Sequence, residues 1–163
     1  MASRVALLVF LCVLPAMVSA IRPAKNPFCL KGRVVCDPCR AGYETSAITH
    51  IAGAEVALEC KDRISNKVVY TKAGKTDPSG EYTMYVDEDR ADNVCDVKLV
   101  RSPQNSCNEA TPGRDQARVI LTRYNGIASN DRFANAMLFM ANEVASGCAE
   151  ILQKMRELDD DEN

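Results

Sequence analysis

The 163-residue sequence has few of the residues from which catalytic and metal sites are most often built. It contains a single histidine, His50, and a single Cys-x-x-Cys pair, Cys36 and Cys39. A closed zinc site needs about four ligands, and no second Cys-x-x-Cys pair supplies the other two. A serine or cysteine nucleophile would have to use His50 as its base, and nothing near His50 suggests such a nucleophile. We therefore predict no catalytic residue, no metal site and no cofactor.

An excess of basic residues is also absent, as is any long apolar run beyond the first 20 residues. The formal net charge is −2, and no dense basic face indicates a nucleic-acid partner. No later stretch approaches the length of a membrane-spanning helix, so no membrane span is expected. The acidic groups at 87–92 and 159–162 lack the pattern of a calcium loop and are interpreted as solvated. No asparagine stands in an Asn-x-Ser/Thr sequon, which predicts no N-linked glycan.

Residues 1–20 are typical of a secretory signal peptide. Arg4 precedes an apolar run from Val5 to Val18, and Val18-Ser19-Ala20 is a small-residue cleavage site. Cleavage there would leave a mature chain of 143 residues, which is enough for one domain with one core. We therefore predict a single-domain protein that is secreted to the extracellular space.

Cysteine is abundant beyond the predicted leader. A small domain with this many cysteines in an oxidising compartment is typical of a disulfide framework. The number is odd, so at least one thiol is free or pairs with another molecule. Six cysteines alone allow about 15 pairings, and the spacing does not choose among them. The seven residues are Cys29, Cys36, Cys39, Cys60, Cys95, Cys107 and Cys148.

Six short runs with strand-like patterning are separated by turn signals such as Asp37-Pro38. This predicts a mainly β domain, built as a small antiparallel sandwich or barrel. From Cys148 to Leu158 the apolar spacing becomes helical, which predicts a C-terminal amphipathic α-helix. Residues 21–30 are interpreted as an N-terminal arm, 31–158 as the domain and 159–163 as an acidic tail. The predicted strands span 31–36, 54–61, 67–72, 81–86, 95–101 and 116–123.

Five segments, taken in order, resemble the Ole e I family of secreted plant pollen proteins. The likeness covers about residues 32–123 and the last cysteine, and the acidic tail is similar to that of pollen-specific grass members. The segments read V-V-C-D-P-C-R-A-G-Y-E-T from Val34, I-A-G-A-E-V-A-L-E-C-K-D from Ile51, T-D-P-S-G-E-Y from Thr76, C-D-V-K-L-V-R-S-P from Cys95 and C-N-E from Cys107.

The resemblance implies a barrel or sandwich closed by three disulfides, with Cys29 left as a free or intermolecular thiol. The protein would then be a monomer or a Cys29-linked dimer. The resemblance also implies a non-enzymatic extracellular protein with allergenic potential. Such a protein would bind a cell-surface receptor or a wall component during pollen hydration or pollen-tube growth. The implied pairs are Cys36–Cys107, Cys39–Cys148 and Cys60–Cys95.

Two features differ from the family pattern, and two other functions stay open. Residues 132–147 lack the usual proline-containing stretch, so their structure is not predicted, and no sequon stands near Asn125. Cys36 and Cys39 would be the reactive pair of a secreted thiol–disulfide oxidoreductase, although no amphipathic helix begins after Cys39 to lower a thiol pKa. A carbohydrate-binding module would show an exposed aromatic stripe. At strand spacing, Tyr82 is expected in the core and Tyr85 on the surface.

Overall fold

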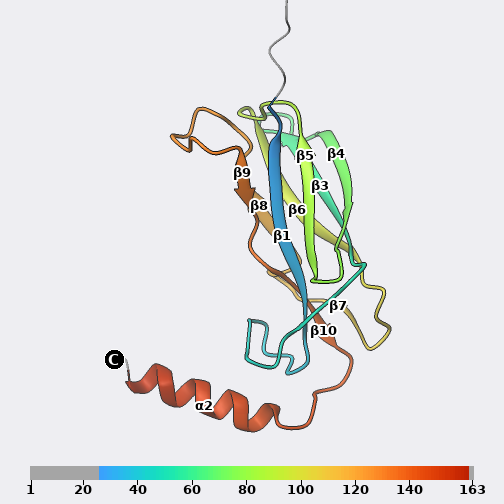
Figure 1. The fold of residues 1–163 in the computed structure, drawn as a ribbon, viewed down its shortest axis with the longest axis vertical. Coiled ribbons are helices and arrows are strands. Elements are labelled where there is room, and N and C mark those ends of the chain that lie inside the picture. The colour runs from blue at the N-terminus through green and yellow to red at the C-terminus, as the bar shows by residue number, and fades with distance from the viewer. Residues whose placement is uncertain (1–25, 162–163) are drawn as a thin grey trace, which may run out of the picture.

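The computed structural model describes residues 26–161 of the chain. The predicted signal peptide and the first half of the predicted arm, residues 21–25, lie outside this range. The strands form one elongated body, and the helix lies at the end opposite the start of β1 (Figure 1). In chain order the elements are β1 (Phe28–Asp37), β2 (Thr49–His50), β3 (Glu55–Asp62), β4 (Val68–Lys75), β5 (Glu81–Val86), β6 (Asn93–Arg101), β7 (Cys107–Ala110), β8 (Gln116–Val119), β9 (Asp131–Phe133), β10 (Met137–Ala141) and α2 (Cys148–Asp161).

Strand β1 exchanges its neighbours half-way along its length. Residues 28–33 pair antiparallel with β5, and residues 29–31 pair parallel with β9. Residues 34–37 pair parallel with β10, and β10 in turn pairs antiparallel with β7. On its other side, β1 pairs antiparallel with β2 at Val35 and Cys36. The exchange lies between Arg33 and Val34, and it shapes the candidate site described below.

A second sheet, in the order β4–β3–β6–β8, is antiparallel throughout. Its inward side chains and those of the β1 sheet form one buried cluster, to which β3 contributes Val56 and Leu58 and β5 contributes Met84 and Val86. Along β5 buried and exposed residues alternate strictly. Full burial of each such side chain stabilises the fold by about 1.5–3 kcal/mol. The predicted fold class, mainly β with a C-terminal helix and three disulfides, is confirmed.

Several boundaries differ from those that the sequence pattern predicts. β1 begins at Phe28, inside the predicted arm, because Phe28 and Leu30 are fully buried and pair with β5. Strands β2, β7, β9 and β10 lie outside the predicted runs, and the β1 pairings with β9 and β10 are parallel rather than antiparallel. β8 ends at Val119, four residues before the predicted end. Helix α2 continues into the predicted acidic tail, to Asp161.

Three disulfides connect segments that are distant in the sequence, and all six of their cysteines are buried. In the chain-entropy model, each such closure stabilises the fold by at most roughly 4–5 kcal/mol, and the contributions are not additive. Cys29 on β1 is free. The pairs are Cys36–Cys107, with Cα atoms 6.0 Å apart, Cys39–Cys148, at 5.3 Å, and Cys60–Cys95, at 4.0 Å.

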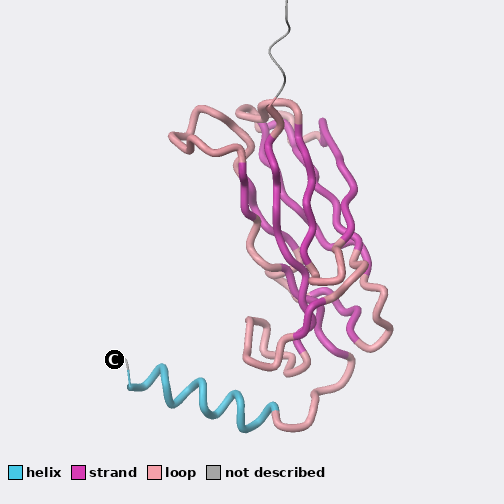
Figure 2. The backbone as a smooth tube through the Cα atoms, in the orientation of Figure 1, coloured by secondary structure: helices cyan, strands magenta, loops and turns pink. Residues whose placement is uncertain are grey.

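Helix α2 extends away from both sheets (Figure 2). Its first residue, Cys148, is buried and joins the helix to Cys39 in the loop after β1. The next apolar residues of the helix, Ile151, Leu152 and Met155, are only half-buried, and Leu158 is 57% exposed. Among residues 26–161, no helix is long and apolar enough to cross a membrane.

Candidate functional site: a cavity beside β1

A cavity of about 650 Å³ opens beside β1 at the point where this strand changes neighbours. β9 ends at Phe133 and β10 begins at Met137, so the residues between them form one wall instead of a paired strand. The other walls come from β1, β5, Glu44 in the loop after β1, and the turn before β8. The volume lies within the range of about 300–1,000 Å³ that is usual for ligand pockets.

Two arginines share one carboxylate at the wall of this cavity. Arg33, from β1, and Arg114, from the turn before β8, donate to different oxygens of Glu44, and the Arg114 Nη2–Oε1 distance is 3.4 Å. Arg114 also donates to the backbone oxygen of Ala136 at 3.3 Å. A guanidinium carries five N–H donors, so these contacts leave donors available to a ligand. Such exposed ion pairs add little to stability.

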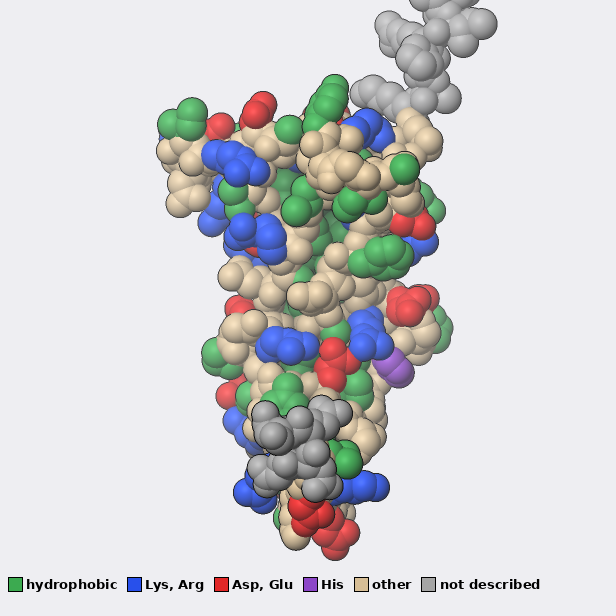
Figure 3. Space-filling model, turned by 90° about the vertical axis from the view of Figure 1, so that its left-hand side faces the viewer, with side chains coloured by type: hydrophobic (Ala, Val, Ile, Leu, Met, Phe, Trp, Pro, Cys, Tyr) green, Lys and Arg blue, Asp and Glu red, His purple; other side chains and the backbone are tan. Residues whose placement is uncertain are grey.

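Charges of both signs balance around the cavity. Lys31, at its edge, pairs with Asp131 across 3.3 Å, and the hydrogen bond from Lys31 to Asp131 raises the pKa of Lys31. On the face shown in Figure 3, basic side chains flank an acidic side chain at mid-height. The cavity therefore offers both donors and acceptors without a strong net field. The charged side chains of the lining are Lys31, Arg33, Arg114, Glu44 and Glu81, and Asp131 lies outside the lining as the partner of Lys31.

Tyr82 forms part of the inner wall, and its buried hydroxyl has no protein partner among the described residues. The residue is 1% exposed and lines the cavity, and its hydroxyl oxygen has no hydrogen-bond partner among the described residues. Burial raises the pKa of Tyr82, so the phenol stays protonated at physiological pH. The ring lies over Gly32, its neighbour in register on β1, where a Cβ would stand 2.3 Å from the hydroxyl oxygen. Gly32 is thus the residue that lets Tyr82 reach the cavity.

Phe133 supplies an exposed aromatic ring at the rim. The residue ends β9 and is 73% exposed, although Phe is a residue that proteins usually bury. It pairs in register with Lys31, whose ammonium lies 5.9 Å from the centre of the ring. Asn135 and Gln116 add exposed amide groups to the same lining. An apolar ring, planar polar groups and a hydroxyl therefore meet around one cavity.

The Cys-x-x-Cys pair is not a dithiol in this structure. Cys36 and Cys39 are each bonded to a distant cysteine, and both are at least 95% buried. The carboxylate of Asp37, between them, accepts hydrogen bonds from the backbone N–H groups of Cys39, at 3.0 Å, and Gly42, at 2.8 Å. This arrangement fixes the loop as an anchor for two disulfides, whereas an exchange motif needs the two cysteines to bond to each other.

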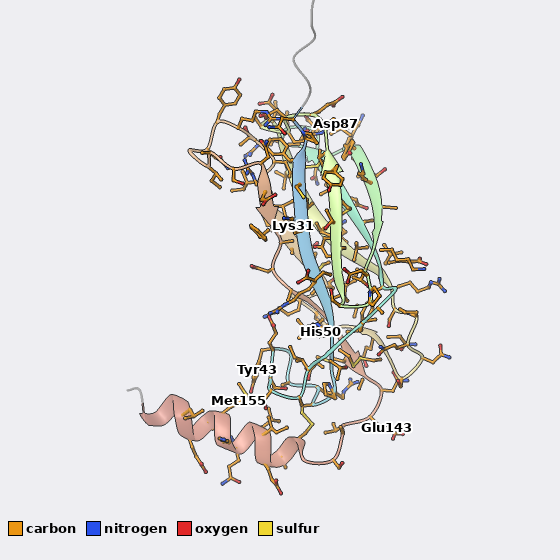
Figure 4. The ribbon with its side chains drawn as sticks, in the orientation of Figure 1. Lys31, Tyr43, His50, Asp87, Glu143 and Met155 are labelled. Carbon is orange, nitrogen blue, oxygen red and sulfur yellow. A yellow bond between two sulfur atoms is a disulfide. The ribbon has the colours of Figure 1, made fainter. Side chains whose placement is uncertain are left out.

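The other groups that the sequence singles out lie apart from the cavity and from one another. His50 is exposed on β2, in the lower half of the body, whereas Asp87 lies at its upper end (Figure 4). In the turn that follows Asp87, Asp89 accepts hydrogen bonds from Thr122 and from the backbone of Arg123. No group of three or more potential metal ligands stands together among the described residues.

The tyrosine predictions are confirmed, but no continuous aromatic stripe links them. Tyr82 is buried and Tyr85 is 55% exposed. Phe133 is exposed on β9, on the other side of β1 from Tyr85, and Tyr124 is 90% exposed in the loop before β9. Sequence reasoning missed Arg33, Glu44, Arg114 and Phe133 as a group. They come together through a parallel pairing that leaves no local signal in the sequence.

Comparison with known proteins agrees with this architecture. The family model described as "Pollen protein Ole e 1 like" matches residues 26–156. This chain belongs to that family. Protein DOWNSTREAM OF FLC of Arabidopsis thaliana is 44% identical over 152 residues, which cover 93% of this chain and 92% of that protein. Pollen-specific protein C13 of Zea mays is 37% identical over 157 residues, covering 96% of this chain and 92% of that protein.

A solved structure shows the same fold. The crystal structure of the major plantain pollen allergen Pla l 1 matches with a TM-score of 0.67 at 31% sequence identity, covering 75% of this chain and 99% of that chain. The Ole e 1-like family is thus one of pollen proteins that includes allergens, and this member is a pollen-associated protein. The maize relative is named as a pollen-specific protein and the plantain relative as a pollen allergen, and none of the three names describes an enzyme.

Proposed function

We propose that this protein is a secreted, non-enzymatic extracellular protein that binds a cell-surface receptor or a wall component during pollen hydration or pollen-tube growth. It would be made with a signal peptide over residues 1–20, and the mature chain would begin at Ile21. Residues 31–158 would act as one domain, with Cys29 available for a linked dimer.

The cavity beside β1 is the observation that carries this proposal. Its wall combines Arg33, Glu44 and Arg114 with an exposed Phe133, which are groups that recognise a partner by hydrogen bonds and stacking. His50, the single imidazole of the chain, lies outside the lining. Three buried disulfides support the proposal of an oxidising, extracellular environment.

A surface-binding assay tests the proposal. The full chain would be expressed in a secretory host, labelled with a fluorophore and applied to growing pollen tubes. We expect saturable binding that unlabelled protein displaces and that reduction followed by alkylation abolishes. Absence of saturable binding would contradict the proposal. So would catalysis of insulin reduction by the native protein, which would favour an oxidoreductase.

A further inference from the structure

The balance of charge around the cavity indicates the chemistry of its ligand. Three basic and two acidic side chains line the space, and Asp131, outside the lining, pairs with Lys31, so a strongly charged ligand gains little net field there. Arg33, Arg114, Glu44 and the amides of Gln116 and Asn135 are planar polar groups that can each make paired hydrogen bonds. A ligand with adjacent hydroxyl groups, each of which both donates and accepts hydrogen bonds, would satisfy such a mixed set of donors and acceptors.

Two further features add to this chemistry. The Phe133 ring, 73% exposed, offers an apolar face against which a saturated ring can place its C–H groups. Tyr82, which lines the inner wall and is 1% exposed, holds its hydroxyl buried behind that wall and unpaired among the described residues. An unpaired buried hydroxyl is unfavourable, so a ligand hydroxyl that reaches it through a small shift of the wall would bind more tightly.

We propose that the cavity binds a neutral saccharide of one or two rings, such as the end of a wall polysaccharide chain or the glycan of a surface protein. The inference rests on the proposed function, because it names the ligand class of the same cavity. One sugar ring would stack on Phe133, and its hydroxyls would lie between the Arg33–Glu44–Arg114 cluster and Tyr82. Both glycan sources share this chemistry.

The test is a titration of the full-length secreted protein with a defined panel of sugars. The neutral probes are galactobiose, xylobiose, arabinobiose and cellobiose, and digalacturonate is the charged comparison. Binding is followed by calorimetry and by backbone amide NMR shifts. We expect at least one neutral disaccharide to bind, with shifts concentrated at residues 31–33, 82 and 133–136. Binding without shifts there, or binding of digalacturonate alone, would overturn the proposal.

Matched variants connect the binding to the cavity. Phe133→Ala and Tyr82→Phe are each expected to lower the affinity for the neutral sugar about two- to tenfold, and Arg33→Gln is expected to lower it about tenfold or more. The controls are Tyr124→Ala, Tyr85→Phe and Arg118→Gln, which change exposed residues outside the cavity lining. Equal losses of sugar affinity in the control variants would overturn the assignment of the binding to the cavity. Tyr82→Phe removes an unpaired buried hydroxyl, so it should fold at least as stably as the native chain.

Failure of this inference can be told apart from failure of the proposed function. If labelled protein binds pollen tubes saturably but no disaccharide binds, the sugar site is wrong and the proposed function stands. If a disaccharide binds in the cavity but pollen tubes bind no protein, the sugar site stands and the proposed function is wrong. A further experiment distinguishes the two glycan sources. Deglycosylation of surface proteins would abolish binding only where the glycan is protein-linked.

Discussion

At the scale of single residues, Gly32 determines whether Tyr82 can lie across β1. A Cβ at Gly32 would stand 2.3 Å from the Tyr82 hydroxyl oxygen and 2.5 Å from Cζ. The β1–β5 ladder fixes the two backbones in register, and the Tyr82 ring is buried, so it has little room to move aside. We therefore expect Gly32→Ala to lower the free energy of unfolding by about 1–3 kcal/mol, the usual cost of overpacking.

A double-mutant cycle measured by urea unfolding checks this explanation. Tyr82→Leu removes the distal ring atoms, and in that background Gly32→Ala should cost less than about 1 kcal/mol. The coupling between the two substitutions is the quantity that matters, because Tyr82→Leu alone also destabilises the core. An equal cost of Gly32→Ala in both backgrounds would show that the strain has another origin.

Asp77 makes the contribution of the turn before β5 to stability depend on pH. Its Oδ1 accepts hydrogen bonds from the Ser79 hydroxyl at 2.6 Å and from the backbone N–H groups of Ser79, at 2.8 Å, and Glu81, at 3.1 Å. The Ser79 hydroxyl is the main cause that lowers the pKa of Asp77 below its ordinary value of 3.8. Since the folded pKa is lower than the unfolded pKa, the stabilisation is present above the unfolded value. It is lost as the pH falls through the folded value.

The variant Asp77→Asn removes this titration. The native protein should lose stability between about pH 4 and pH 2, and the variant should show a shallower loss over the same range. Chemical unfolding at a series of pH values measures the difference. Asp87→Asn is the control, because it removes one negative charge from an exposed aspartate whose side chain accepts no hydrogen bond from the described residues. Parallel curves for native and Asp77→Asn protein would refute the linkage.

At the scale of elements, α2 depends on one covalent link rather than on packing. Its apolar residues beyond Cys148 are half-buried or exposed, and the helix extends away from the sheets. The double substitution Cys39→Ser with Cys148→Ser should therefore release the helix while both sheets remain folded. Hydrogen exchange should show lost protection over residues 148–161 and unchanged protection in β3 and β6.

The matched variant is Cys60→Ser with Cys95→Ser, which removes the disulfide between the paired strands β3 and β6. Here we expect a loss of up to roughly 4 kcal/mol in the stability of the sheets, because both residues lie in the core. If removal of the Cys39–Cys148 link also melts β3 and β6, the helix is part of the cooperative unit and our interpretation is wrong.

Elements with a local signal were predictable from the sequence, and elements without one were not. β5 alternates through Tyr82, Met84 and Val86, so its bounds coincide with the predicted run. β10 reads Met-Leu-Phe-Met-Ala, and its first three residues are all buried, so period two is absent and the segment resembles a buried helix as much as a strand. β9 has only three residues. The cavity depends on β9 and β10 running parallel to β1, a long-range pairing that no local pattern encodes.

At the scale of the whole molecule, the disulfide pattern separates an anchored scaffold from a redox enzyme. Each cysteine of the Cys36–Cys39 pair is buried and bonded to a different distant segment. Cys29 is the single free thiol among residues 26–161, and it is partly exposed. Since buried disulfides are shielded from thiolate attack, brief treatment with mild reductant should leave all three intact.

Peptide mapping of the secreted protein, alkylated before digestion under non-reducing conditions, is the decisive measurement. We expect the alkyl label on Cys29 alone, or Cys29 in a linked dimer that a non-reducing gel resolves. The bridged peptides should pair Cys36 with Cys107, Cys39 with Cys148 and Cys60 with Cys95. A Cys29→Ser variant should keep the same bridged peptides and run only as a monomer. A bridge between Cys36 and Cys39, or alkylation of both, would instead mean that the loop after β1 is a dithiol, and the oxidoreductase hypothesis would replace the binding protein.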